Sequence, residues 1–544
     1  MSTNAVSVPL SASSKRWTLV ACILGSGIVF LDGTVVNVAL PAIQRDLGAS
    51  LASQQWVVEA YLLTLSSLLL LGGSLDDLFE RRTVFVWGVA SFGACSALCA
   101  AAPNVEFLIA ARALQGIAGA LLVPSTLAII MSTFREDERG AAIGSWTAWT
   151  GIATVVGPLA GGLLIDSISW RLIFVLNIPL VLFTLALTAR HVPRSDSHQP
   201  GVRVDFLGGL LCALGLGGVV FALIEQPRLG WGSPAVAASG LGGIAALGLF
   251  VAHERRTRDP MLPLELFRSR NFAVGNLATL TMYAGLGGGL FFLGLFLQQV
   301  RGYSALAAGA AFLPITALMF TLSRRMGGLA DKFGPRLFMG VGPLIAGAGL
   351  GLLLRIGTSV SYTSQLLPAL VVFGLGLSLT VAPLTATVLG AVDQRHSGVA
   401  SGVNNAIARV AGLIAIAALG AVVAGRFQTV VNRDLAGVSL SPRAQAAVRQ
   451  ARARPLSTIS ANGLAGREHA IVFHALDHAS VSAFRLGIGL TSGLVVMGGL
   501  VSLVGIQNPR RKVRAEECPG GAICGASRDV AEALPATEPA PEPA

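Results

Sequence analysis

Long apolar stretches follow one another along most of the chain, and short polar segments separate them. They lie at 17–39, 54–74, 84–102, 106–131, 141–165, 171–190, 206–224, 235–252, 271–299, 304–322, 337–354, 364–391, 398–425 and 482–505. An α-helix rises about 1.5 Å per residue, so about twenty residues cross the roughly 30 Å hydrocarbon core of a bilayer. The pattern therefore predicts an all-α polytopic membrane protein with fourteen transmembrane helices in contact with the lipid bilayer.

The composition agrees with this interpretation. Of the 544 residues, 53% are hydrophobic and only 12% are charged, whereas a soluble domain carries about twice that share of charge. The formal net charge of +11 comes from basic residues that lie between the apolar stretches. Such residues set membrane topology, so we expect no nucleic-acid partner. The six cysteines have no spacing typical of a metal site, and we expect none.

The distribution of basic residues predicts the orientation. An even number of spans puts both termini on one side, and 24 Lys and Arg residues fall on that side against five in the short segments opposite. The positive-inside rule therefore predicts cytoplasmic termini, in the inner membrane of a bacterium. The segment 426–480 carries seven arginines on the opposite side. Because long loops translocate largely regardless of charge, we interpret it as a long external loop.

Three sequence matches indicate an internal repeat. Gly73 and Asp77 match Gly327 and Asp331 at an offset of 254 residues. Pro124 matches Pro383 at an offset of 259, and RGAAIG at 139–144 resembles SGVASG at 397–402 at an offset of 258. Spans 2, 4 and 5 thus map onto spans 10, 12 and 13, which predicts two six-helix bundles separated by two extra helices. Paired bundles around a midplane site are typical of secondary transporters.

The predicted organisation follows from the repeat. We expect a cytoplasmic N-terminus at 1–16, a first bundle at 17–190, two linker helices at 206–252, a second bundle at 271–505 that contains the external loop 426–480, and a disordered cytoplasmic tail at 506–544.

Three ionisable residues are embedded in the first bundle. Asp32, Glu59 and Arg112 each lie about 8–10 Å from the external ends of their spans. An intramembrane charge costs roughly 2.5–3.5 kcal/mol on insertion scales, and a carboxylate beside Arg112 would offset much of that cost. Aligning Pro124 with Pro383 places Val371 opposite Arg112, so the equivalent helix forms without the charge.

This comparison favours a functional role for the embedded charges. A carboxyl group that gains and loses contact with a guanidinium changes its affinity for protons. Arg112, Asp32 and Glu59 are therefore candidates for proton coupling or substrate binding, with a static ion pair as the alternative. Which of the two acids carries the proton stays open. Gln115 lies on the same helical face as Arg112 and is a candidate for cavity lining.

A second polar stripe crosses span 13, where Asn404 and Asn405 precede Arg409 near the midplane. These residues either line a cavity, or Arg409 hydrogen-bonds helix carbonyls within its own bundle. In span 5, Gly157, Pro158 and Gly161 combine a proline with small residues. That combination fits tight helix packing, and it also fits a hinge for alternating access.

The turn after span 2 carries further candidates for conformational gating. Asp76, Asp77, Arg81 and Arg82 are interpreted either as solvated topology charges or, together with Gly73, as a gate. Recurrence of the turn around Asp331 in the second bundle favours the gate.

Several motifs resemble those of the major facilitator superfamily. GGSLDDLFERR resembles its loop motif, RALQGIAGA its span-4 motif, and GPLAGG the span-5 motif of its proton-coupled drug exporters. FLDGTVVNVALP, WVVEAYLLT, WRLIFVLNIP and ASGVNNAIARVAG resemble the fourteen-span drug:proton antiporter subfamily, and the resemblance covers residues 17–505.

The resemblance implies an exporter that expels small hydrophobic or cationic drugs in exchange for protons by alternating access. It implicates Arg112 in proton coupling, Asp32 and Glu59 in coupling or cation recognition, and Asp77 in a conformational latch. Glu80 departs from the loop motif, which has glycine at that position. We expect no cofactor besides the proton motive force, and a monomer.

Two other functions compete with drug export. One is a dedicated proton-driven exporter of a single natural product, metabolite or lipid, and the other is a membrane-embedded sensor. The sequence lacks a Walker lysine motif, H-E-x-x-H and G-x-S-x-G, so we do not expect an enzyme.

Overall fold

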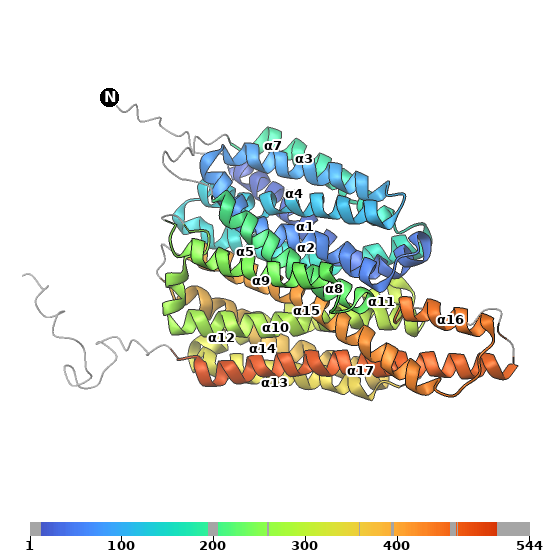
Figure 1. Ribbon diagram of the computed structural model, residues 1–544. Helices are drawn as coiled ribbons and strands as arrows, with labels where there is room; N and C mark the ends of the chain where they lie inside the picture. The colour runs from blue at the N-terminus through green and yellow to red at the C-terminus, as the bar shows by residue number, and fades with distance from the viewer. Residues whose placement is uncertain are drawn as a thin grey trace, which may run out of the picture. The chain divides into compact units, whose positions relative to one another are not determined.

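The computed structural model describes residues 12–193, 205–257, 260–357, 360–392, 397–456, 464 and 466–508. The chain to Ile506 packs as one unit of helices that run side by side (Figure 1). Thirteen helices in the described part are long and apolar enough to cross a membrane, and α2 (Leu51–Leu78) is a further long helix between two of them. The protein is therefore a multi-pass membrane protein. Residues 1–11 and 509–544, which include most of the expected tail, lie outside the described residues.

The first bundle contains six spans, because a short and a longer helix together form the sixth. Its elements are α1 (Ala12–Leu47), α2, α3 (Arg81–Ala100), α4 (Val105–Thr133), α5 (Glu136–Ser167), α6 (Leu172–Val175) and α7 (Asn177–His191). The side chain of Asn104 begins α4 by accepting a hydrogen bond from the backbone N–H of Phe107 at 2.8 Å.

Two extra helices, α8 (Phe206–Leu229) and α9 (Pro234–Glu254), form an antiparallel pair between the bundles in the chain. Helix α8 packs against α2 and α15 (Ser397–Asp434). The indole N–H of Trp56 in α2 donates a hydrogen bond to Glu225 in α8 at 3.2 Å. The outward side chains of the pair are apolar, as lipid contact requires.

The second bundle repeats the first. Its elements are η1 (Leu264–Arg268), α10 (Arg270–Leu295) with η2 (Phe296–Val300), α11 (Ala305–Ala311), α12 (Leu313–Phe333), α13 (Pro335–Leu352) with η3 (Leu353–Arg355), η4 (Tyr362–Leu366) with α14 (Leu367–Gly390), α15 and α17 (Gly466–Gly505). In the first bundle α1 packs on α5, α2 on α4 and α3 on α4; in the second α10 packs on α15, α12 on α14 and α13 on α14.

The repeat extends to individual contacts. Gly116 of α4 lies against the backbone of Tyr61 in α2, and Gly374 of α14 lies against the backbone of Ile315 in α12. Tyr61 and Ile315 differ by the offset of 254 residues that relates Gly73 to Gly327. The corresponding helix pairs of the two bundles therefore both approach each other closely at a glycine, although the residue that the glycine contacts differs.

The segment 426–480 is not the long loop that we expected. Helix α15 continues to Asp434, α16 spans Pro442–Ala453, and α17 begins at Gly466. The reason is that its apolar residues have helical spacing, and Val430, Val448 and Val472 pack in one buried cluster with the second bundle. With 38 residues, α15 is about 57 Å long and exceeds the hydrocarbon thickness of a bilayer.

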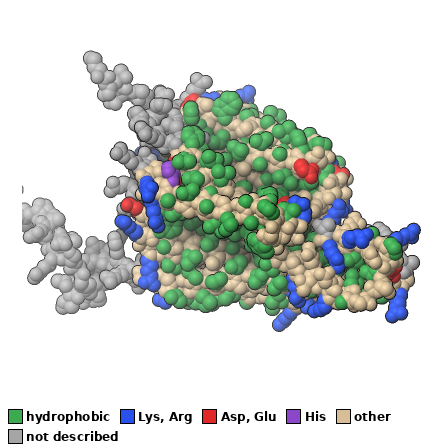
Figure 2. Space-filling view, in the orientation of Figure 1, with side chains coloured by type: hydrophobic (Ala, Val, Ile, Leu, Met, Phe, Trp, Pro, Cys, Tyr) green, Lys and Arg blue, Asp and Glu red, His purple; other side chains and the backbone are tan. Residues whose placement is uncertain are grey.

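The helices of both bundles run between two opposite ends of the molecule. The terminal end is where α1 begins and α17 ends, and the α16 end is opposite (Figure 1). Figure 2 shows hydrophobic side chains over the flank of the helices, whereas Lys and Arg gather mainly toward these two ends.

Candidate functional site

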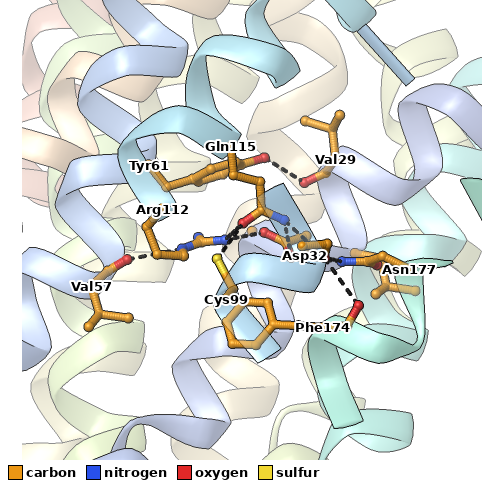
Figure 3. Close-up of polar contacts among 12 residues, drawn as sticks. Val29, Asp32, Val57, Tyr61, Cys99, Arg112, Gln115, Phe174 and Asn177 are labelled. Carbon is orange, nitrogen blue, oxygen red and sulfur yellow. Dashed lines mark hydrogen bonds and ion pairs between the residues drawn. The ribbon is translucent and has the colours of Figure 1, made fainter. Parts of the chain in front are cut away.

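A buried ion pair between α1 and α4 forms the centre of the site (Figure 3). The guanidinium of Arg112 donates to Asp32 Oδ2 through Nη1, and it also donates to the backbone oxygen of Val57 at 3.1 Å and to Gln115 Oε1 at 2.7 Å. Its Cζ lies 4.1 Å from the ring centroid of Tyr61. Arg112 is 1% exposed and Asp32 is 0% exposed, so the charges are compensated within the protein rather than by water.

Amide and hydroxyl groups complete the coordination of Asp32. Its Oδ1 accepts hydrogen bonds from Gln115 at 3.1 Å and from Asn177 at 2.9 Å. Ser96 accepts from the same two amides at 3.2 and 2.9 Å and donates to the backbone oxygen of Phe174 at 3.1 Å. The network thus joins helices α1, α3, α4 and α7, all in the first bundle.

Sequence reasoning found part of this network. It placed Asp32 and Arg112 at one depth, but it proposed Gln115 as a cavity-lining residue, whereas Gln115 is a fully buried member of the network. It missed Ser96 and Asn177 because a single polar residue in an apolar helix has no periodic signature. Asn177 stands in the quoted segment WRLIFVLNIP, which was the available signal.

Glu59 lies apart from this network. Its side chain is 0% exposed, and neither carboxyl oxygen has a hydrogen-bond partner among the described residues. It lies one turn after Gln55, so it shares the face of α2 from which Gln55 donates to the backbone oxygen of Ile416 in the second bundle at 2.7 Å. Equal depth in the membrane did not bring Glu59 to Arg112, because depth does not fix the direction of a side chain around its helix.

The polar stripe of α15 divides between two environments. Asn404 donates to Asn276 Oδ1 at 3.0 Å and to Thr279 Oγ1 at 2.8 Å, so it belongs to the interior of the second bundle rather than to a cavity wall. Asn405 is exposed. The guanidinium of Arg409 reaches the first bundle, where it lies 5.5 Å from the ring centroid of Phe30.

The candidates for gating at the terminal end contact their own bundle. Arg81 donates to the backbone oxygen of Ala128 at 3.4 Å and Arg82 to that of Ala189 at 3.0 Å, both in the first bundle. Asp331 is exposed on α12. The surroundings of Gly73 and the side chain of Asp77 lie outside what the structure describes.

The glycines of the span-5 motif make close helix contacts in two directions, toward α1 of the first bundle and toward α11 of the second bundle. Gly157 packs against Thr34 of α1, and Gly161 packs against Val35 of the same helix. Toward the second bundle, a Cβ at Gly162 would lie 2.6 Å from the Cα of Leu306, and one at Gly309 would lie 2.7 Å from the backbone oxygen of Pro158. Helices α5 and α11 therefore meet backbone to backbone.

Asp166, which the sequence analysis did not single out, stabilises the contact between α5 and α11. Its two carboxylate oxygens accept hydrogen bonds from the backbone N–H groups of Ala305 and Leu306, at 3.1 and 2.9 Å. Between Gln54 and Gln299 a further hydrogen bond of 2.8 Å joins the bundles. Among the described side chains, the hydrogen bonds between the bundles all lie in the half toward the α16 end, so the structure is closed there.

Two repeated helical bundles that meet beside buried ionisable residues define a membrane transporter. The Major Facilitator Superfamily profile matches residues 22–416, and the chain belongs to that family. It is 39% identical to the puromycin resistance protein pur8 of Streptomyces alboniger over 415 residues, covering 76% of this chain and 82% of that one. It is 33% identical to the tetracenomycin C resistance and export protein of Streptomyces glaucescens over 496 residues, covering 90% of each.

Other comparisons agree on family and fold. The multidrug resistance protein Stp of Mycobacterium tuberculosis (strain CDC 1551 / Oshkosh) is 36% identical over 411 residues, covering 75% of each chain. The crystal structure of a bacterial homologue of the lysosomal transporter Spinster, inward-facing and unoccupied, aligns with a TM-score of 0.62 at 18% identity and covers 92% of this chain and all of that one. At that identity the likeness concerns the fold alone.

Proposed function

We propose that this protein is a proton-coupled exporter of small hydrophobic or cationic drugs. The observation that carries the proposal is the set of buried ionisable groups in the first bundle: Asp32 compensated by Arg112, and Glu59 without a partner at the face toward the second bundle. The names of the relatives, which are resistance and export proteins, support the substrate class.

In this proposal Glu59 carries the exchanged proton. Burying a carboxylate without a partner is costly, so the side chain is stable as the neutral acid while α2 and α15 are closed around it. Opening of the α16 end breaks the contact of Gln55 with Ile416 and exposes Glu59 to external water, from which it binds a proton. After the bundles close again, substrate entering from the terminal end displaces the proton to the cytoplasm.

Arg112 and Asp32 have a complementary role. Every partner in their network belongs to the first bundle, so the network moves as a unit when the bundles rock. It holds α1 and α4 at a fixed distance and presents compensated charge beside the proton carrier. A cationic substrate then gains from an ionised Glu59, which links substrate entry to proton release.

We place the terminal end in the cytoplasm and the α16 end outside the inner membrane of a bacterium. The 24 Lys and Arg residues of the terminal side support this orientation. In this proposal the protein acts as a monomer, uses no cofactor other than the proton motive force, and is not an enzyme.

A second candidate is the dedicated exporter of one natural product. Relatives named for resistance to a single compound, puromycin or methylenomycin A, favour it. The two candidates differ in substrate range and not in mechanism, so a panel of compounds separates them.

The test is transport by purified protein in liposomes with an imposed pH gradient. We expect uphill movement of at least one cationic dye, coupled proton flux, and loss of both when a protonophore collapses the gradient. Glu59→Gln should stop uphill movement, whereas Glu106→Gln, a matched change at an exposed carboxyl on α4, should not. If no compound moves and no proton flux accompanies any of them, the proposal is wrong.

A further inference from the structure

One face of α15 changes from exposed to closed along its length. Asn405, Arg409, Gly412 and Ile416 are spaced by four, three and four residues, so they share a face of the helix. Asn405 is exposed, Arg409 and Gly412 are half-buried, and Ile416 is 4% exposed. Exposure thus decreases from the terminal end toward the α16 end.

The closed part of this face is the contact with α2. Gln55 donates to the backbone oxygen of Ile416 at 2.7 Å, and a Cβ at Gly420 would lie 2.0 Å from Gln55 Nε2. A Cβ at Gly412, in contrast, would meet nothing within 4 Å. Arg409 therefore lies where the exposed part of the face ends, next to unfilled space.

Within the described part of the chain, the positive charge of Arg409 has no anionic partner. Its guanidinium lies 5.5 Å from the ring centroid of Phe30 in α1, and among the described residues it makes no hydrogen bond and no ion pair. Asp32, the acid two residues after Phe30 in α1, is already bound by Arg112, Gln115 and Asn177. An aromatic face stabilises a cation only in part, so the site keeps an uncompensated positive charge in the membrane.

We propose that Arg409 and Phe30 form a subsite for the acidic head group of an amphipathic substrate, an inference that rests on the proposed export function. A guanidinium matches a carboxylate or sulfonate with two parallel hydrogen bonds, and Phe30 offers an apolar surface to the adjoining ring of such a molecule. The substrate class then includes aromatic organic anions and zwitterions as well as cations. Glu59 and Arg409 would recognise opposite charges from the two bundles.

A matched pair of ligands tests the subsite directly. Anthracene-9-carboxylate and its methyl ester share one aromatic body and differ in charge, and their fluorescence reports binding to the purified full chain in nanodiscs. We expect the carboxylate to bind the unmodified protein more tightly than the ester. Arg409→Gln should weaken carboxylate binding by about tenfold or more and leave ester binding unchanged, because a desolvated charge pair loses one partner.

Further variants keep the result interpretable. Arg409→Lys retains the charge without the bidentate geometry, so its affinity for the carboxylate should lie between those of the unmodified protein and Arg409→Gln. Arg355→Gln, a change at an exposed arginine of the second bundle, should leave carboxylate binding unchanged. Uphill transport of tetraphenylphosphonium by Arg409→Gln shows that the variant folds and that proton-coupled export stands.

The contrary results are equally definite. Equal binding of acid and ester to the unmodified protein, or no binding of either, overturns the subsite. So does an equal loss of acid, ester and tetraphenylphosphonium in Arg409→Gln, which would make Arg409 a structural residue or a counter-ion that other conformations use. Failure of the unmodified protein to move any compound would instead refute the export function.

Discussion

The two bundles have the same helix packing but different polar interiors. In the first, an ion pair and its amides join α1, α3, α4 and α7. In the second, the neutral group of Asn404, Asn276 and Thr279 joins α15 to α10. Val371 stands at the position of Arg112 in the repeat, and Ile315 at that of Tyr61. The helices that correspond to α2 and α4 therefore pack without a charge at these two positions, so the packing itself does not require Arg112.

The largest effect is expected from Arg112→Ala. It leaves Asp32 buried without its counter-charge, and losing one partner of a buried ion pair costs about 3–5 kcal/mol. Uphill transport in a pH gradient should be abolished, and the melting temperature should fall. Val371→Ala, at the matching position of the second bundle, should retain transport; full transport by Arg112→Ala would reduce the pair to a structural element.

Glu59→Gln should separate coupling from stability. Glutamine mimics the neutral acid in shape and removes the exchangeable proton, so the fold should be kept. We expect uphill accumulation to disappear while downhill exchange of substrate across the membrane continues. Measuring both modes in the same liposomes decides the matter, since parallel loss of the two would mean that Glu59 binds substrate or supports the fold instead.

Asn177 and Asn404 allow the two bundles to be compared by variants that each lose two side-chain hydrogen bonds. Asn177→Ala removes hydrogen bonds to Asp32 and Ser96, and Asn404→Ala removes hydrogen bonds to Asn276 and Thr279. Each should destabilise the protein by about 1–3 kcal/mol, because buried partners lose a donor.

Only Asn177→Ala should also slow uphill transport, because its donor contacts the carboxylate that balances Arg112. Stability is measured by thermal unfolding in detergent, and transport by initial rates in liposomes. An equal loss of transport in Asn404→Ala would remove the functional distinction between the bundles.

Much of the fold is predictable because hydropathy and length decide it. The spans and the repeat follow from apolar stretches and from three matches in order. The helical structure of the segment 426–480 is not predictable in this way, since α16 mixes arginines with alanines and has no apolar stretch of its own. Counting residues from the span ends predicted the equal membrane depth of Asp32 and Arg112. It does not predict the direction of a side chain around its helix, so the separate position of Glu59 was not foreseen. Asp166 was not predicted because its partners are backbone N–H groups of the other bundle, which leave no pattern in the sequence.

The smallest expected effect concerns how the two bundles are held together. Asp166→Asn keeps one oxygen acceptor for the backbone N–H groups of Ala305 and Leu306 but removes the charge that strengthens both hydrogen bonds. Closure at the α16 end should weaken by about 1 kcal/mol, which changes the ratio of closed to open molecules by about fivefold. Transport should change little, because both conformations still occur in the cycle.

Spin labels at the exposed positions Ser167 and Ala307, in a cysteine-free background, measure the separation of α5 and α11. Asp166→Asn should increase the population with the longer distance, and Glu106→Gln should not. If the distance distribution is unchanged, the backbone contacts of Gly162 and Gly309 hold the α16 end closed without help from the carboxylate. Closure would then rest on these contacts and on the hydrogen bonds that Gln54 and Gln55 form with the second bundle.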